Sequence, residues 1–271
     1  MCRVVRLGEK VHENRFFLPE ALKRADAALK EFSELINRHS VEKVVATATS
    51  AARDVSNGQD LIKLGAKYQI PITIIEGERE ATLSFEGALS GFTSNLQKSI
   101  LVVDVGGGST ELIFREAGAK AIVAKSFDIG CVRLTEMFLK QDPIAIDELN
   151  SLSTFASKTL STFGPVHPES IVAVAGTPTT LACVAQGIDF NEAQVDGYLL
   201  TKGQIELLTS RLSSMPLAER KKLKGLEPLR AEVIIAGGAL LISALDISGA
   251  SEMTVSTRGL RYGVALHYKE F

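Results

Sequence analysis

The residue types that could handle phosphate gather in one glycine-rich segment, DVGGGSTE, at residues 104–111 of this 271-residue chain. Asp104 ends a buried apolar run, where an unpaired charge is costly, so we expect it at the open end of a strand. The glycines that follow can take positive φ angles and bring backbone N–H groups close to an anion. The phosphate-binding candidates in this segment are Gly106, Gly107, Gly108, Ser109 and Thr110.

Glu111 places a second carboxylate at the end of the same segment. Backbone donors flanked by Asp104 and Glu111 fit a phosphate that is held next to Mg²⁺ or an activated water. A glycine hairpin turn with solvated polar neighbours is the alternative that the segment alone leaves open. The chain has no GxxxxGK[ST], which excludes a P-loop, and the alternating apolar residues after the glycines argue against a Rossmann turn.

Two segments upstream carry further charged candidates. In ATATSAAR, residues 46–53, small and hydroxylated residues end a strand, and Arg53 could clamp a phosphate with two hydrogen bonds. A solvated arginine at the start of a helix is the alternative. In IIEGEREA, residues 74–81, Glu78 and Glu80 open a helix, where acids often complement the helix dipole. If the helix starts at a cleft, such a carboxylate could instead activate water as a general base.

Three segments downstream carry weaker signals. In AVAGTPTTLA, residues 173–182, a strand runs into Gly176 and Thr177 just before a helix. A helix start of this kind could hold a second phosphate, or it could be an ordinary N-cap. Gly259 and Gly263 permit close packing in VSTRGLRYGV, and the basic run RKKLKG fits a solvated face or an attraction for a polyanion.

The composition excludes several classes of protein. A formal net charge of −2 favours neither a nucleic acid polymer nor an anionic membrane as partner. The chain contains no apolar run of about 18 residues, so no transmembrane helix is predicted. The three cysteines are widely spaced and form no CxxC pair, which indicates reduced thiols and a cytoplasmic protein.

The elements that must position the candidate residues alternate between strands and helices, which predicts an α/β fold. A polar stretch at residues 93–99 separates two series of such elements. The first series consists of a strand over 2–7, a helix from Pro19 to about 36, a strand within 41–53, a helix over 57–68, a strand over 72–75 and a helix over 79–91.

The second series begins with a predicted three-stranded antiparallel meander over residues 100–105, 111–116 and 121–127. Helices and strands then alternate to the end of the chain. The predicted helices are 132–140, 146–163, 179–186, 202–213, 238–247 and one from about 260. The predicted strands are 171–175, 232–236 and 252–256.

Six motifs, taken in order along the chain, carry a resemblance to a known family. ATxxxR, ExExEA, DxGGGSTE, GTxTTLA, RAEVIxAG and SxxGLRxGV together resemble the exopolyphosphatase / guanosine pentaphosphate phosphohydrolase family, from about residue 3 to 268. The resemblance implies two ribonuclease-H-like α/β domains of the actin, hexokinase and Hsp70 type, facing a cleft. We expect these domains at 1–95 and 96–271, with a C-terminal helix at about 260–271 that packs back on the first.

The resemblance also implies an activity. Members of the family release the terminal phosphate of inorganic polyphosphate or convert pppGpp to ppGpp with Mg²⁺, and we expect a homodimer. The sequence does not choose between the two substrates. By the same resemblance, Glu80 is the general base, and Asp104 and Glu111 position the metal and the water. The implied phosphate contacts are Arg53, the loop at residues 106–110, and the loop at Gly176 and Thr177.

One departure from the family pattern bears on activity. The family's first domain opens with strands that carry an Asp-x-Gly-Ser phosphate loop, and we expect roughly the first two strands to be missing here. A non-catalytic phosphate- or nucleotide-binding module, or an inactive fragment of the enzyme, is therefore an alternative function. A sugar or acetate kinase of the same fold is another, although the ExExEA and glycine patterns fit it poorly.

Overall fold

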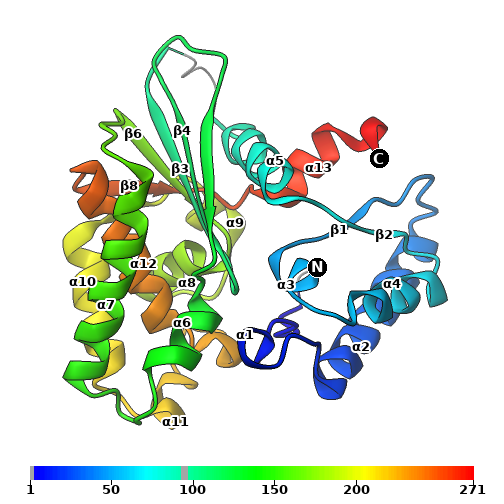
Figure 1. Cartoon of the computed structure of the whole chain (residues 1–271), viewed down its shortest axis with the longest axis horizontal. Coiled ribbons are helices and arrows are strands. Elements are labelled where there is room, and N and C mark those ends of the chain that lie inside the picture. The colour runs from blue at the N-terminus through cyan, green and yellow to red at the C-terminus, as the bar shows by residue number, and fades with distance from the viewer. Residues whose placement is uncertain (1–2, 93–96) are drawn as a thin grey trace. The chain divides into compact units, whose positions relative to one another are not determined.

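The computed structural model describes residues 3–92 and 97–271, and these divide into two compact units (Figure 1). The first unit comprises Met1–Glu80 with His267–Phe271, and the second comprises Ala81–Leu266. The chain passes from the first unit to the second within one helix, α5 (Gly77–Leu89). The predicted domain boundary at residues 95/96 falls in the segment 93–96, outside the described residues.

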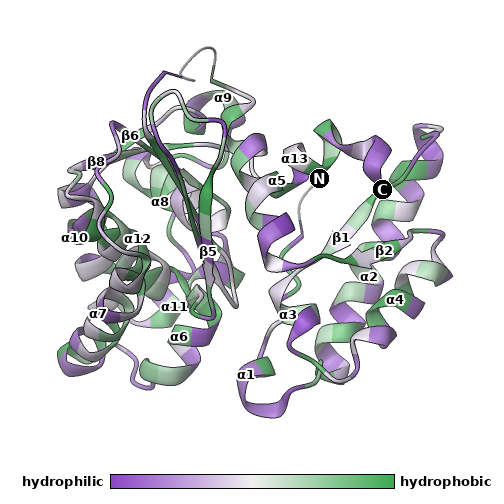
Figure 2. Ribbon diagram, turned by 45° about the horizontal axis from the view of Figure 1, so that its top comes forward, coloured by the Kyte–Doolittle hydropathy of each residue, from purple (hydrophilic) through white to green (hydrophobic). Residues whose placement is uncertain are grey.

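The first unit packs helices against a short parallel pair of strands, β1 (Ala46–Ala48) and β2 (Ile72–Ile74). Pro19 starts the longest helix, where its missing N–H costs nothing, and this helix carries both hydrophobic and hydrophilic residues along its length (Figure 2). The predicted helices and strands between residues 19 and 91 are confirmed. The helices of this unit, besides the start of α5, are α1 (Val11–Asn14), α2 (Pro19–Arg38), α3 (Ser50–Arg53), α4 (Gly58–Lys67) and the 3₁₀ turn η3 (Tyr268–Glu270).

The predicted strand over residues 2–7 is wrong. Among the described residues, 3–10 form irregular chain and turns, and Arg6 and Lys10 have positive φ angles of 47° and 54°. A left-handed backbone at these two positions cannot continue a β-strand. The apolar residues Val4, Val5 and Leu7 gave the segment the composition of a strand.

The second unit is built on a six-stranded sheet in the order β5-β4-β3-β6-β8-β7. The predicted antiparallel meander forms β3 to β5, and β6 and β8 continue the sheet parallel to β3. This is the strand order of a ribonuclease-H-type domain, extended by the antiparallel edge strand β7, so the predicted fold class is confirmed. The strands are β3 (Ile100–Val105), β4 (Thr110–Arg115), β5 (Val123–Phe127), β6 (Ser170–Val174), β7 (Leu199–Thr201) and β8 (Glu252–Val255).

Helices cover both faces of this sheet. Leu101 and Val103 of β3 face the larger core, shared with α7 and α12, whereas Ile100 and Val102 face the other side and α5. This alternation is the period of two expected for a strand that is buried on both faces. The helices of the unit are α6 (Cys131–Phe138), α7 (Ile146–Leu160), α8 (Gly176–Gln186), α9 (Glu192–Val195), α10 (Lys202–Ser213), α11 (Leu217–Arg220), α12 (Ile234–Ser248) and α13 (Leu260–Leu266), with 3₁₀ turns η1 (Ser161–Phe163) and η2 (Pro228–Arg230).

The predicted strand over residues 232–236 is wrong, because residues 234–236 begin α12 and the residues just before them form a turn. Helix α12 is buried on nearly all sides, so its sequence is apolar without a helical period and resembles a buried strand. The strand β7 and the single turn α9 were not predicted. In the described part of the chain, no helix combines the length and the apolar character needed to cross a membrane.

Candidate active site

Asp104 and Glu111 lie directly opposite each other on β3 and β4, in the antiparallel register of the first hairpin. Opposed residues of such a pair point to the same face of the sheet, here the face that also carries Ile100, Val102 and Ile113. Only 8% and 1% of the surfaces of Asp104 and Glu111 are exposed. Burial raises the pKa of Asp104, and a hydrogen bond from Ser84 partly offsets that rise.

Each of these carboxylates accepts a hydrogen bond from a serine hydroxyl. Ser84 of α5 donates to Oδ2 of Asp104, and Ser126 of β5 donates to Oε1 of Glu111 over 2.7 Å. Ser126 lies opposite Glu111 in the β4–β5 register, which is why the two side chains meet. Neither serine was predicted from the sequence. The available signal for Ser84 was a polar residue within the apolar face of a helix.

The glycine loop between β3 and β4 is fixed through its carbonyl groups. The Gly106 N–H donates to the Ser109 carbonyl over 3.0 Å and closes the turn. The Gly106 and Gly107 carbonyls each accept from backbone N–H groups at the start of α6, those of Cys131 and Val132, over 2.9 Å. Among the hydrogen bonds of the described residues, none uses the N–H groups of Gly107 or Gly108. The loop is therefore rigid and keeps backbone donors available for an anion.

The two hydroxyl residues of the loop are both buried. Thr110 donates from Oγ1 to the Ile129 carbonyl over 2.6 Å and so ties β4 to the segment that leads into α6. Ser109 is almost fully buried at the turn itself. The phosphate-binding role predicted for Thr110 stays a prediction. Its hydroxyl already donates to a backbone carbonyl.

Gly176 and Thr177 start α8, as the sequence predicts for a helix N-terminus. The guanidinium of Arg230 lies directly over Gly176, in the space that a Cβ atom would occupy. Thr177 is buried and packs against Gly237 of α12, where a side chain would leave no room. Arg230 is the residue of this region that sequence reasoning missed, although it opens the RAEVIxAG motif.

Cys131 connects the glycine loop to the start of α8. Its N–H donates to the Gly106 carbonyl, and its thiol lies near Thr177 and Arg230. Burial raises the pKa of the Cys131 thiol, and the nearby Arg230 charge and Thr177 only partly oppose that rise. A thiol of this kind is inert, so Cys131 serves as packing between two candidate phosphate-binding loops.

In the first unit, Arg53 and Glu80 form an ion pair of 2.9 Å between Nη1 and Oε2, with 19% and 9% of their side chains exposed. The same Nη1 atom donates to the Ile75 carbonyl over 2.6 Å. The topology explains the meeting, because β1 leads into α3 with Arg53 and its neighbour β2 leads into α5 with Glu80. Arg53 was predicted to bind phosphate, and the structure pairs it with Glu80, the predicted base.

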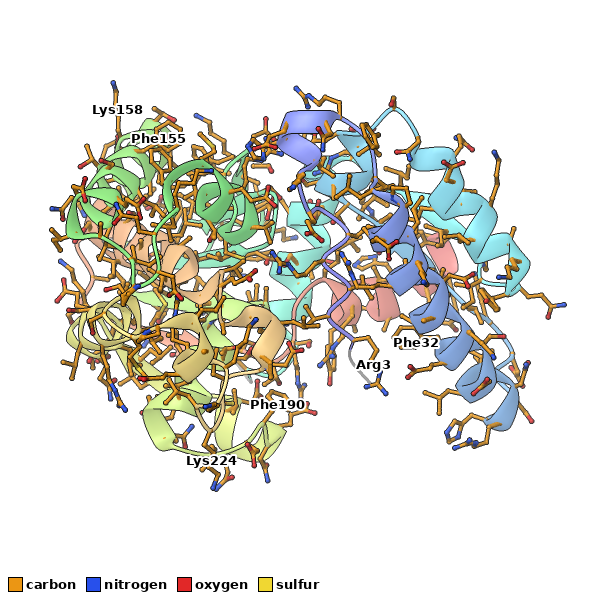
Figure 3. All side chains as sticks on the ribbon, turned by 90° about the horizontal axis from the view of Figure 1, so that it is seen from below. Arg3, Phe32, Phe155, Lys158, Phe190 and Lys224 are labelled. Atoms are coloured by element: carbon orange, nitrogen blue, oxygen red, sulfur yellow. The ribbon has the colours of Figure 1, made fainter. Side chains whose placement is uncertain are left out.

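The basic run at residues 220–225 divides into a structural part and a solvated part. Arg220 is buried and bonds to Asp142 over 3.2 Å and to the Ala231 carbonyl over 3.2 Å. Lys221, Lys222 and Lys224 are exposed, and Lys224 points away from the fold (Figure 3). The arginine thus stabilises the fold, and only the lysines remain for attraction of a polyanion.

The residues present can be tested for their fit to Mg²⁺. The described residues contain no group of three or more His, Cys, Asp or Glu side chains arranged to hold a metal ion. Mg²⁺ at phosphate sites, however, uses one or two carboxylates together with water and substrate oxygens. Asp104 and Glu111 supply two such carboxylates side by side, and their like charges favour a cation between them. The pair therefore fits Mg²⁺ whose other ligands are water or phosphate oxygens.

The chain is similar to known proteins over nearly its full length. The sequence profile described as "Ppx/GppA phosphatase family" matches residues 2–269. Exopolyphosphatase 2 of Mycobacterium tuberculosis is 34% identical, over 97% of this chain and 86% of the relative. A guanosine-5'-triphosphate,3'-diphosphate pyrophosphatase of Aliivibrio fischeri is 30% identical, over 97% of this chain and 52% of the relative.

A solved structure shows the same fold. The crystal structure of an exopolyphosphatase from Cytophaga hutchinsonii aligns with 99% of this chain and 88% of its own, at 29% identity and a TM-score of 0.87. Sequence profile, relatives and fold all agree over nearly the full length of the chain. The chain belongs to the Ppx/GppA phosphatase family.

Proposed function

We propose that this protein hydrolyses the terminal phosphoanhydride bond of inorganic polyphosphate or of pppGpp. The observation that carries the proposal is the β3–β4 hairpin, in which a glycine loop with available N–H groups lies between two opposed buried carboxylates, Asp104 and Glu111. The N–H groups of such a loop can bind the phosphate oxygens. The two carboxylates can bind a cation that neutralises the charge of the phosphate.

The relatives support either substrate. The Mycobacterium tuberculosis relative is named an exopolyphosphatase, and the Aliivibrio fischeri relative is named for a guanosine phosphate. Both substrates end in a phosphate joined by an anhydride bond. The exposed lysines at 221, 222 and 224 favour neither, since both substrates are polyanions.

The proposed reaction needs an oriented water and no covalent intermediate. The Glu80 carboxylate accepts a proton from the water as the water oxygen attacks the terminal phosphorus. A bond forms between the water oxygen and the terminal phosphorus while the bridging P–O bond breaks. The electron pair of the broken bond stays on the bridging oxygen, which leaves with the shortened polyphosphate or with ppGpp. Arg53, through its ion pair with Oε2, holds the Glu80 carboxylate in one orientation.

Mg²⁺, when bound by Asp104 and Glu111, would neutralise charge on the phosphate oxygens. The N–H groups of Gly107 and Gly108 then bind the terminal phosphate, while Arg230 and the start of α8 offer positive charge to a neighbouring phosphate. Because an anhydride is a good leaving group, positioning and charge neutralisation supply most of the rate.

The test is phosphate release from polyphosphate and from pppGpp, with Mg²⁺ and with excess EDTA. We expect Mg²⁺-dependent release by the wild type and a loss of about 10²–10⁴-fold in Glu80→Gln. Glu78→Gln is the matched control, because Glu78 is an exposed acid in the same first turn of α5. The control variant should keep the wild-type rate.

Two outcomes would count against the proposal. Equal rates for Glu80→Gln and the wild type would exclude Glu80 as the base. A wild type that binds polyphosphate but releases no phosphate would instead support a non-catalytic binding module. The predicted homodimer and the predicted cytoplasmic location stay predictions.

A further inference from the structure

Ser84 is a polar residue on the apolar face of a buried helix. Its neighbours on this face of α5, Ala81, Phe85 and Ala88, pack against Ile100 and Val102 of the sheet. Ser84 itself has no exposed surface. A buried hydroxyl costs free energy unless it makes a hydrogen bond, so alanine would suit this position better for packing alone. The hydroxyl must therefore contribute something that packing does not explain.

The partner of Ser84 is Asp104, one of the two opposed carboxylates. The serine hydroxyl donates to Oδ2, and a charged carboxylate can only accept, so the direction of this hydrogen bond is fixed. Asp104 is nearly buried, so few water molecules can reach it to replace the hydroxyl. The bond fixes the rotation of the carboxylate about its Cβ–Cγ bond and thereby fixes the direction in which Oδ1 points.

Helix α5, which carries Ser84, packs closely against residues 259–263 through glycines. Gly263 of α13 lies against α5 so closely that a Cβ atom there would overlap the Leu83 carbonyl. Gly87 of α5 in turn lies against Gly259, where a side chain would again find no room. Contacts between backbones through glycines allow no sliding of the kind that flexible side chains permit. The serine therefore sits on a helix whose position is set from the other side.

We propose that Ser84 is a positioning residue for Mg²⁺, acting through Asp104, an inference that rests on the proposed function. By holding Oδ2, Ser84 keeps Oδ1 directed as a cation ligand beside the Glu111 carboxylate. Groups that orient metal ligands in this way raise the affinity for the metal about 10–100-fold. The competing explanation is that the hydrogen bond only joins α5 to β3. In that case, replacing Ser84 would leave the affinity for the metal unchanged.

The experiment measures the dissociation constant for Mg²⁺, and for Mn²⁺ as a second probe, by calorimetric titration of the whole chain without substrate. The variants are Ser84→Ala and, as matched control, Ser248→Ala. Ser248 is also a buried helical serine, but its hydroxyl bonds only to carbonyls of its own helix, those of Ala244 and Leu245. Thermal unfolding of each variant shows whether it is folded at the temperature of the titration.

We expect Ser84→Ala to raise both dissociation constants about tenfold, and Ser248→Ala to leave them unchanged. In assays, Ser84→Ala should need more Mg²⁺ for half-maximal rate while the KM for polyphosphate at saturating Mg²⁺ stays the same. If Ser84→Ala does not fold, Ser84→Cys, which keeps a weaker donor of similar shape, should give an intermediate loss of affinity.

Metal affinity equal to wild type in the folded Ser84 variants would overturn the proposal, and a lower unfolding temperature alone would then mark Ser84 as a structural tie. A wild type with no measurable Mg²⁺ or Mn²⁺ binding would overturn both this proposal and the metal site of the proposed function. The two failures are distinguishable, because only the second is visible in the wild type.

Discussion

Asp104 and Glu111 oppose each other across β3 and β4, and both carboxylates are buried. Opposed like charges destabilise an antiparallel pair, and burial adds the cost of desolvation. A fold that keeps this arrangement has placed two unfavourable charges at the mouth of a glycine loop. We propose that a bound cation and phosphate relieve this repulsion, which would link the hairpin to the proposed function.

Asp104→Asn should raise the free energy of unfolding of the metal-free protein by about 1 kcal/mol, because it removes one of the two opposed charges. The amide oxygen still accepts from Ser84. Burial raises the folded-state pKa of Asp104 above its unfolded value. The wild type therefore loses stability as the pH rises from the unfolded pKa through the folded pKa, and the variant does not.

The measurement is urea unfolding in EDTA across pH 4–8, with the gain of Asp104→Asn growing with pH. Asp189→Asn is the control, because Asp189 is exposed and its removal should change stability by less than about 0.5 kcal/mol. The same Asp104→Asn protein should lose the stabilisation that added Mg²⁺ gives the wild type. A variant less stable than wild type throughout would show that the two carboxylates do not repel.

Arg53→Ala should lower the free energy of unfolding by about 3 kcal/mol, because it leaves the Glu80 carboxylate nearly buried without its charged partner. The Ile75 carbonyl loses a donor at the same time. The double variant Arg53→Ala/Glu80→Gln should be more stable than Arg53→Ala alone, since no buried charge remains. Urea unfolding of the two single variants and the double variant gives the coupling energy, and strictly additive losses would contradict the ion pair.

Two of the helices predicted from the sequence carry a start signal in their first turn. Helix α2 begins at Pro19, and α10 begins with a capping box between Thr201 and Gln204. Helix α12 has neither signal, because it is apolar on all sides, and its first residues were predicted as a strand. Periodicity reports the contrast between a buried and an exposed face, so an element with no exposed face gives no period.

The candidate site divides in the same way. Asp104, Glu111 and the glycines could be predicted because they lie together in one segment. Their partners Ser84 and Ser126 could not, since they reach the carboxylates only through the packing of α5 on β3 and the pairing of β4 with β5. Arg230 likewise meets Gly176 only in the folded chain. The pairing of Arg53 with Glu80 likewise depends on β1 and β2 being neighbours, which no local pattern reveals.

Gly130→Ala should weaken phosphate binding by displacing the glycine loop. Gly130 has an extended backbone, with φ of −132°, that alanine adopts without strain, so the effect comes from space alone. A Cβ atom there would overlap the Gly107 carbonyl and lie 2.7 Å from the Gly106 carbonyl. We expect a KM for polyphosphate raised about tenfold and a loss of about 1–3 kcal/mol of stability.

Gly203→Ala is the control for Gly130→Ala, because a Cβ atom at Gly203 of α10 would meet nothing within 4 Å. Alanine in a helix is favoured over glycine, so this variant should be as stable as wild type or up to about 1 kcal/mol more stable. Phosphate release assays and thermal unfolding check both variants. A Gly130→Ala protein with the KM of the wild type would show that the loop is not the phosphate site.

Arg230→Met should raise the KM for polyphosphate and pppGpp about 10–100-fold, the effect of losing one charged hydrogen-bond partner. The reason is the position of its guanidinium over Gly176 at the start of α8, where helix dipole and side chain both favour an anion. Methionine keeps much of the length and packing of the side chain, so stability should change little. Arg211→Met, at an exposed arginine of α10, is the control.

A second variant separates the charge of Arg230 from its position. Gly176→Ala leaves the charge in the chain but places a methyl group where the guanidinium lies, so the arginine must move. If Arg230 binds phosphate from its present place, Gly176→Ala should raise KM in the same direction as Arg230→Met, and the double variant should add little to either. Wild-type KM values in both single variants would remove Arg230 from the site.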